Sequence, residues 1–297
     1  YEVKNGTILI FDATTDQFVT SAELGTMNPW TDVKADGVTT AAIATVKLSN
    51  VSVTGNYNAL VLLNNNTTDN DTKKVTLPST ADTYATWSKD ASKANATNYV
   101  STDGIFMANA PMYSATSEPT TLVKIKNVCA SPEEAQAKAA TVVYVERGLA
   151  KVTMKDFTAG GYPIADGTYA GGKVEIKNWQ LDVTNNSTFP VHQTGTLKDS
   201  WAEIWNTPRF YDQTSTAFKR VYWGVDPNYN EAKYQVLANC KTAFKMITKD
   251  DVNGVTANPQ YCLENTFDLD NMKQGQTTRV VFKSVFTPKN FTTGQTF

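Results

Sequence analysis

His192 is the only histidine in the chain and is therefore the first residue to consider for catalysis. A Ser-His-Asp triad would have to use it as the general base, beside a serine held on a glycine-rich turn. No Gly-x-Ser-x-Gly sequence occurs in the chain. Without that turn we expect a histidine on the surface or at a strand end, with a catalytic histidine as the alternative.

Phosphate and metal sites are each suggested only by fragments of a motif. The pairs Gly160-Gly161 and Gly171-Gly172 lack the spacing and the following Lys-Ser/Thr of a P-loop, so they predict hairpin turns. The segments Asp69-Asn70-Asp71 and Asp268-Leu269-Asp270 resemble parts of a calcium loop without its downstream glutamate. Asp and Asn are also common turn residues. We therefore expect turns here, and no catalytic residue, metal or cofactor in the chain.

The three cysteines, Cys129, Cys240 and Cys262, do not have the spacing of a metal motif. Cys240 and Cys262 would pair in an oxidising compartment. Free cysteines are also commonly buried as small apolar residues, so both interpretations stay open.

Aromatic side chains are concentrated between Trp201 and Tyr229. Trp201, Trp205 and Trp223 are candidate contacts for a ligand, because this block would make a face on which sugars stack. The large packing area of aromatic side chains favours the alternative, in which the block forms core and anchors loops of a second domain.

Composition narrows the classes of partner. The chain has 297 residues, 41% of them apolar, with 27 Lys and Arg against 29 Asp and Glu. This balance gives no reason to expect nucleic acid or an anionic membrane as a partner. No apolar run approaches the roughly 18 residues of a membrane span. Abundant Thr, Asn and Ser favour strands and turns, a composition common in extracellular β proteins.

Hydrophobic periodicity predicts many strands and two helices. Strands are expected at residues 7–11, 17–20, 41–53, 57–63, 105–107, 122–126, 173–183, 258–263 and 277–286. Helices are expected at residues 80–95 and 132–140. The second helix has Ser131 as N-cap, Pro132 at the first helical position and Glu134 placed to complete a capping box.

The β-branched run at residues 141–154 lies near the middle of the chain and predicts a domain boundary. Glu146, Arg147 and Gly148 interrupt its strand pattern. We predict two strands in series with a bend or bulge at Arg147-Gly148; one long bulged strand is the alternative. With no β-α-β alternation, the fold class is all-β, as two β-sandwich domains at residues 1–146 and 147–297.

The order of the motifs resembles a known family. The sequences are ILIF at 8–11, ALVLLN at 59–64, VYVERGLAKV at 143–152, WQL at 179–181, YCLENT at 261–266 and TRVVFKSVFTPK at 278–289. Together they are similar to the fimbrillins, the type V pilins of Bacteroidales, and look closest to the minor-fimbrillin branch. The ERxxAK and ENT sequences are the specific parts of this resemblance.

The resemblance implies a non-enzymatic subunit of cell-surface fimbriae with two tandem transthyretin-like β-sandwiches, the second lacking its final strands. In that family a lipid-anchored precursor is exported through the periplasm and outer membrane, and an arginine-specific protease removes an N-terminal strand. A strand of a neighbouring subunit then fills the groove, which gives a head-to-tail polymer. Tyr1, directly before the first strand, fits this processing.

The same resemblance places a candidate interface at Ile8, Ile10 and Phe11, beside the processed N-terminus. Fimbriae support adhesion, so host or bacterial surface receptors are expected as further partners. The alternative function is a surface adhesin or tip protein that binds glycan or host protein through residues 201–229.

Overall fold

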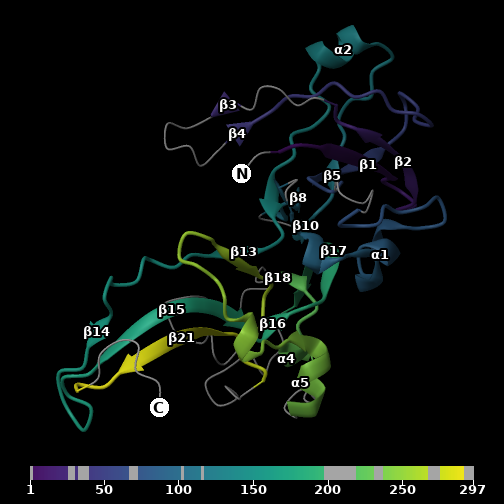
Figure 1. Ribbon diagram of the computed structural model, residues 1–297. Coiled ribbons are helices and arrows are strands. Elements are labelled where there is room, and N and C mark those ends of the chain that lie inside the picture. Colours follow the sequence, from purple (N-terminus) through teal and green to yellow (C-terminus); the bar gives the residue numbers. More distant parts are fainter. Residues whose placement is uncertain are drawn as a thin grey trace. The chain divides into compact units, whose positions relative to one another are not determined.

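The computed structural model describes residues 3–25, 31–32, 40–66, 73–101, 104–114, 117–196, 219–230, 237–266 and 275–290. Most of its regular structure is antiparallel strand, so the predicted all-β class is confirmed. The chain divides into two compact units (Figure 1). Unit 1 comprises Tyr1–Leu149 and Ser187–Val225, and unit 2 comprises Ala150–Asn186 and Asp226–Phe297.

The first division falls between Leu149 and Ala150, whereas we predicted it between Glu146 and Arg147. The segment Ser187–Val225 belongs to unit 1 and not to the second unit, which a single cut through the sequence does not anticipate. The chain therefore passes between the units three times.

The elements of unit 1 are β1 (Gly6–Asp12), β2 (Phe18–Glu23), β3 (Thr31–Asp32), β4 (Thr40–Ala41), β5 (Tyr57–Leu63), α1 (Tyr84–Trp87), η1 (Ala91–Lys93), η2 (Ala96–Asn98), β6 (Val100–Ser101), β7 (Gly104–Ile105), β8 (Met107–Asn109), β9 (Met112–Ser114), β10 (Ser117–Thr120), β11 (Val123–Lys124), α2 (Pro132–Ala137), β12 (Val145–Arg147), β17 (Thr188–Thr196) and β18 (Lys219–Gly224). Those of unit 2 are β13 (Ala150–Val152), β14 (Tyr162–Pro163), β15 (Lys173–Asp182), β16 (Thr184–Asn185), α4 (Pro227–Asn230), α5 (Leu237–Ala243), β19 (Phe244–Lys245), η5 (Lys249–Asp251), β20 (Gln260–Cys262) and β21 (Arg279–Thr287).

Unit 1 is built on one antiparallel sheet with the strand order β12-β8-β5-β1-β2, and β11 also pairs with β5. Residues alternate between its faces along each strand. On one face Ile10 and Ala59 form a cluster with Ile125, against which Leu48 and Val51 pack. The other face carries Phe11, whose ring lies 6.4 Å from that of the buried Trp87. The β17–β18 ribbon packs over this second face, where Trp223 meets Phe106 edge to face.

Asn109 completes the sheet where two strands share one side of β5. Along that side β8 pairs with Leu62 and Leu63, and β11 pairs with Asn58 and Ala59. Between them the Asn109 Oδ1 accepts the Val61 N–H at 2.8 Å, and its Nδ2 donates to the Ala59 carbonyl at 3.1 Å. Nδ2 also donates to the Thr121 carbonyl at 2.8 Å. A buried amide side chain thus replaces the missing backbone partner.

The joint at residues 141–154 consists of two strands, as predicted. β12 ends at Arg147 and pairs with β8 in unit 1, and β13 begins at Ala150 and pairs with β20 in unit 2. The alternative of one long strand is therefore wrong. Gly148 lies against Tyr99: a Cβ at this position would be 3.1 Å from its ring carbons, so a side chain here would require the ring to move by a few tenths of an ångström.

Two predicted elements of unit 1 are wrong. Residues 42–53 are described and contain no strand; Leu48 and Val51 pack against the sheet without pairing to it. The helix expected at residues 80–95 is only α1 followed by η1. Short polar side chains form hydrogen bonds with backbone groups there; for example, Asp90 Oδ1 accepts the Ser92 N–H at 3.0 Å. Such bonds compete with the backbone hydrogen bonds that would extend the helix.

The helix at 132 is confirmed as α2, with Pro132 in its first turn and the Ser131 hydroxyl accepting the Glu134 N–H at 3.3 Å. Glu134 does not complete a capping box: its carboxylate accepts the N–H of Ala130, at 3.4 Å, instead of that of Ser131.

The cysteines of unit 2 are not bonded to each other. None of Cys129, Cys240 and Cys262 forms a disulfide, so the pairing interpretation is wrong and the buried-residue interpretation holds for Cys240. Cys240 packs with Val183 and Phe244. Burial raises the pKa of both the Cys240 and the Cys262 thiol, which keeps them protonated at neutral pH.

We predict that Cys240 will react with a thiol reagent at least about a hundredfold more slowly in the folded chain than in denaturant, because its thiol is both buried and protonated. The measurement is alkylation at pH 7 followed by mass spectrometry of the cysteine peptides. Equal rates with and without denaturant would contradict the burial of this thiol.

Candidate functional site

Among the residues that the structure describes, the β14-β15-β21 sheet of unit 2 has one edge that is hydrogen-bonded to other parts of the chain and one edge, that of β21, that is not. β15 pairs with β21 along its whole length, from Lys173 opposite Thr287 to Asp182 opposite Arg279 (Figure 1). The other side of β15 is closed first by β14 and then by side and main chain from outside the sheet. Within the described residues β21 pairs with β15 alone. Its outer N–H and C=O groups can therefore pair with an added strand.

Gln260 of β20 closes the β15 edge. Its Oε1 accepts the Leu181 N–H at 2.8 Å, and its Nε2 donates to the Trp179 carbonyl at 3.1 Å. The Trp179 N–H donates to the Gly254 carbonyl at 3.1 Å. Because this side of the sheet is already hydrogen-bonded, addition of a strand is directed to β21.

One face of the β15–β21 ribbon is apolar. Cross-strand partners point to the same side of a sheet, and most apolar residues of β15 lie opposite apolar residues of β21. It is formed by Val174, Ile176, Trp179 and Leu181 of β15 and by Val280, Phe282, Ser284 and Phe286 of β21. Trp179 is fully buried, whereas Phe282 and Phe286 are 46% and 43% exposed. Phe157 and Tyr169 touch these two phenyl rings edge to face, at 6.1 and 5.5 Å between centroids. The apolar face is therefore more exposed along β21, where both phenyl rings keep about half of their surface in solvent, than along β15.

The opposite, polar face carries most of the charge. Lys177 is the extra residue of a bulge between Ile176 and Asn178, and it pairs with Glu175. The hydrogen bond from Lys177 lowers the pKa of the Glu175 carboxyl. Lys283 lies opposite Asn178 and is exposed, and no ion pair connects it to any residue that the structure describes.

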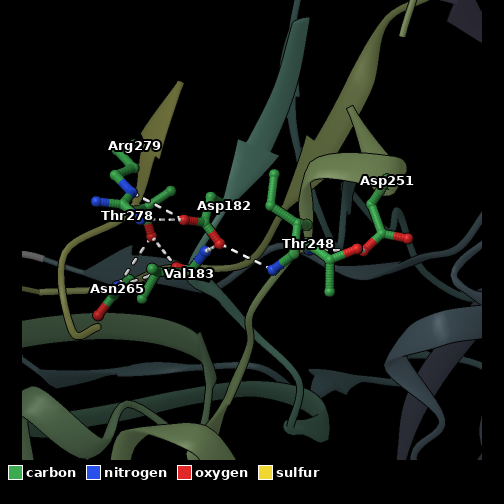
Figure 2. Close-up of polar contacts among 8 residues, drawn as sticks. Asp182, Val183, Thr248, Asp251, Asn265, Thr278 and Arg279 are labelled. Atoms are coloured by element: carbon green, nitrogen blue, oxygen red, sulfur yellow. Dashed lines mark hydrogen bonds and ion pairs between the residues drawn. The ribbon is translucent and has the colours of Figure 1, made fainter. Parts of the chain in front are cut away.

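The end of the ribbon is anchored by Asp182, a buried carboxylate (Figure 2). Its Oδ2 accepts from the Arg279 Nε at 2.8 Å and Nη2 at 2.7 Å. Its Oδ1 accepts the N–H groups of Val183 at 2.9 Å and Ile247 at 3.0 Å. The carboxylate is fully hydrogen-bonded, so it fixes β21 against β15 at this end.

Asn265, from the ENT sequence, braces the residue after Asp182. Val183 has φ +57°, which is strained for a β-branched residue. Its carbonyl accepts from the Thr278 hydroxyl at 2.7 Å, and Asn265 Nδ2 donates to that same hydroxyl at 2.9 Å (Figure 2). The ENT sequence and the start of β21 thus hold the turn that ends β15.

The predicted interface residues lie in unit 1, in the centre of its sheet. β1 is paired on both sides, by β2 and β5, so it offers no free edge. Ile10 and Phe11 are fully buried, and only Ile8 is half-buried. Ile8 packs against two clusters, one of which contains Val61, Leu63 and Met107. Of the three, Ile8 alone has surface left to contact a partner.

The candidate ligand contacts are not exposed where they can be placed. Trp223 is 2% exposed and packs among Tyr99, Phe106 and His192. The packing interpretation is therefore right for Trp223, although its core is that of unit 1 and not of the second domain. Trp201 and Trp205 lie outside the described residues, as do the Asp69–Asp71 and Asp268–Asp270 segments.

His192 lies neither on the surface nor at a strand end, so that prediction is wrong. It is 7% exposed, in the middle of β17, with its ring 4.2 Å from that of Trp223. Its Nδ1 faces a carboxylate oxygen of Glu146 on β12. The histidine joins β17 to the main sheet of unit 1.

The described residues contain neither a cluster of metal ligands nor a membrane-spanning helix. No group of three or more His, Cys, Asp and Glu side chains is placed to hold a metal ion. No helix in this part of the chain is long and apolar enough to cross a bilayer.

Comparisons with known proteins gave distant structural likenesses only. No protein-family model and no curated protein sequence matches the chain. Two solved structures from Parabacteroides distasonis, each named as a candidate cell adhesion protein, are similar to it. One has 13% identity and a TM-score of 0.43 over 96% of this chain and 67% of its own. The other has 12% identity and a TM-score of 0.39 over 98% and 75%. At these values neither likeness bears on function.

Proposed function

We propose that the chain is a non-enzymatic structural subunit of a cell-surface fimbrium and that it assembles by accepting a β-strand from a neighbouring subunit at β21. The observation that carries the proposal is the edge of β21, unpaired within the described residues, beside an apolar face on which Phe282 and Phe286 are about half exposed. An unpaired strand edge with exposed apolar side chains promotes association with another strand, so this arrangement is typical of an interaction site.

Strand addition at β21 would pair the backbone groups of its outer edge and would also cover its exposed apolar side chains. Main-chain hydrogen bonds extend the sheet, and alternate side chains of the incoming strand cover Phe282 and Phe286. The two partners use different surfaces, so the contact repeats head to tail and generates a filament. Surface location, export as a lipoprotein precursor, support of adhesion and membership of the minor-fimbrillin branch complete the proposal and rest on the sequence resemblance.

Replacing both Phe282 and Phe286 with lysine is expected to raise the protein concentration needed for assembly roughly a hundredfold. Each phenyl has about half of its surface left to bury, and a lysine in its place must be desolvated, so about 3 kcal/mol is lost per contact. Assembly of the purified chain is measured by light scattering after size exclusion and by negative-stain electron microscopy across a concentration series.

Ile43→Lys is the matched control, because Ile43 is 96% exposed and belongs to unit 1. It removes one exposed apolar side chain and adds one positive charge, half of the charge change in the double variant, away from β21, and it should assemble like the unaltered chain. The proposal fails if the double variant assembles at the same concentration as the control, or if the unaltered chain stays monomeric throughout the series.

A further inference from the structure

We infer that the strand accepted at β21 carries a carboxylate side chain opposite Lys283 and a large apolar side chain opposite Ser284. This inference rests on the proposed function, since it specifies which strand the open edge selects. The evidence for it comes from the side chains on the two faces of β21.

The apolar face of β21 has a gap at Ser284. Phe282 and Phe286 lie two residues away on either side and point to the same face, with a small side chain between them. A large aliphatic residue opposite Ser284 would lie between the two phenyl rings and contact both. Large residues opposite the rings themselves would compete for the same space. The incoming strand is therefore expected to place its largest apolar residue opposite Ser284 and smaller ones opposite the rings.

The polar face of β21 selects by charge. Lys283 stands between Val281 and Val285, which point to the same side. The acidic residues of the neighbouring β15 are already engaged, Glu175 by Lys177 and Asp182 by Arg279. Lys173 adds a second positive charge on this face, opposite Thr287. An incoming carboxylate opposite Lys283 would form a cross-strand ion pair, whereas an incoming lysine would be repelled.

A second copy of β21 does not meet these requirements. The strand RVVFKSVFT contains no acidic residue, so edge-to-edge pairing of two β21 strands would supply no counter-charge for either Lys283. The chemistry favours a different segment: an extended stretch of protein with alternating apolar residues and one Asp or Glu between them.

The test uses two synthetic peptides, each with a fluorescent label and a soluble tail. One is Val-Thr-Leu-Glu-Val-Thr-Val, which in antiparallel register places Leu opposite Ser284 and Glu opposite Lys283. The other has Lys in place of Glu. We expect the full chain to bind the Glu peptide about fivefold more tightly than the Lys peptide, and Lys283→Glu to reverse the order. Fluorescence anisotropy titration at low and high salt gives both ratios.

The controls separate this inference from the proposed function. Lys249→Glu makes the same charge change at an exposed residue of η5 and should leave the peptide ratio unaltered. If both peptides bind equally to the unaltered chain and to Lys283→Glu, but not to the Phe282→Lys, Phe286→Lys variant, β21 accepts strands and only the charge selection is wrong. If neither peptide binds the unaltered chain, strand acceptance at β21 is wrong as well.

Discussion

Replacing Asn109 with leucine should lower the free energy of unfolding of unit 1 by about 4 kcal/mol. Leucine has a similar volume, so packing changes little, but the substitution removes three hydrogen bonds that Asn109 makes within the sheet. The buried Val61 N–H would then lose its Asn109 acceptor, and the carbonyls of Ala59 and Thr121 would each lose a hydrogen bond. Each such group costs about 1–3 kcal/mol, and the three are not additive.

Urea titration followed by pulse proteolysis measures this loss, and mass spectrometry of the fragments assigns the transition to unit 1. Asn127→Leu is the control: Asn127 is exposed and makes a single side-chain bond, to the Ala139 carbonyl at 3.1 Å. Its substitution should change stability by less than about 0.5 kcal/mol. Equal midpoints for the two variants would show that Asn109 does not bridge the gap beside β5.

Replacing Asp182 with asparagine should destabilise the β15–β21 ribbon by about 3 kcal/mol. The amide keeps one oxygen but turns its NH2 group toward donors, either the Arg279 guanidinium or the N–H groups of Val183 and Ile247. Charge-assisted hydrogen bonds are lost and a donor faces a donor in a buried position. The end of β21 nearest Arg279 should separate from β15 first.

The loss of stability is measured by hydrogen exchange with mass spectrometry on peptides that cover residues 173–182 and 279–287. A loss of about 3 kcal/mol corresponds to roughly 150-fold faster exchange. Asp250→Asn in η5 is the control, since Asp250 is exposed and the substitution makes the same chemical change. Unchanged exchange in both peptides would remove Asp182 as the anchor of the open edge. If the proposed function is right, the Asp182→Asn substitution should also weaken assembly, because the Arg279 end of β21 would no longer be held against β15.

The strands of the site could be predicted because the residue types within each segment determine whether it forms a strand. β15 and β21 carry apolar residues at strand-like spacings. Alternation alone did not show which of them share a face, because the extra residue Lys177 brings Trp179 and Leu181 to the same face as Val174 and Ile176. The break at Arg147-Gly148 could also be predicted, since two charges and a glycine interrupt an apolar pattern. The Ser131-Pro132 start of α2 depends on backbone groups within one turn.

What could not be predicted depends on distant partners. Nothing near Asn109 in sequence reveals that β5 has a gap beside it, and Gln260 gives no local signal that it closes the edge of β15. The apolar residues of 41–53 suggested a strand, but Leu48 and Val51 pack against the sheet without pairing within it, and the sequence does not distinguish the two cases. Ile8, Ile10 and Phe11 were predicted as an interface from their place in the chain, whereas their burial depends on β2 and β5.

The three passages of the chain between the units have a mechanical meaning. They fall after Leu149, after Asn186 and after Val225, next to the ends of β12, β17 and β18. A force that pulls the two units apart would act on three covalent links, each leading into a strand that is hydrogen-bonded within unit 1. Unzipping β12 alone would not release the load. The same connectivity means that cutting the gene at the codon for Ala150 would strip unit 1 of the β17–β18 ribbon, so neither half would be a complete folding unit.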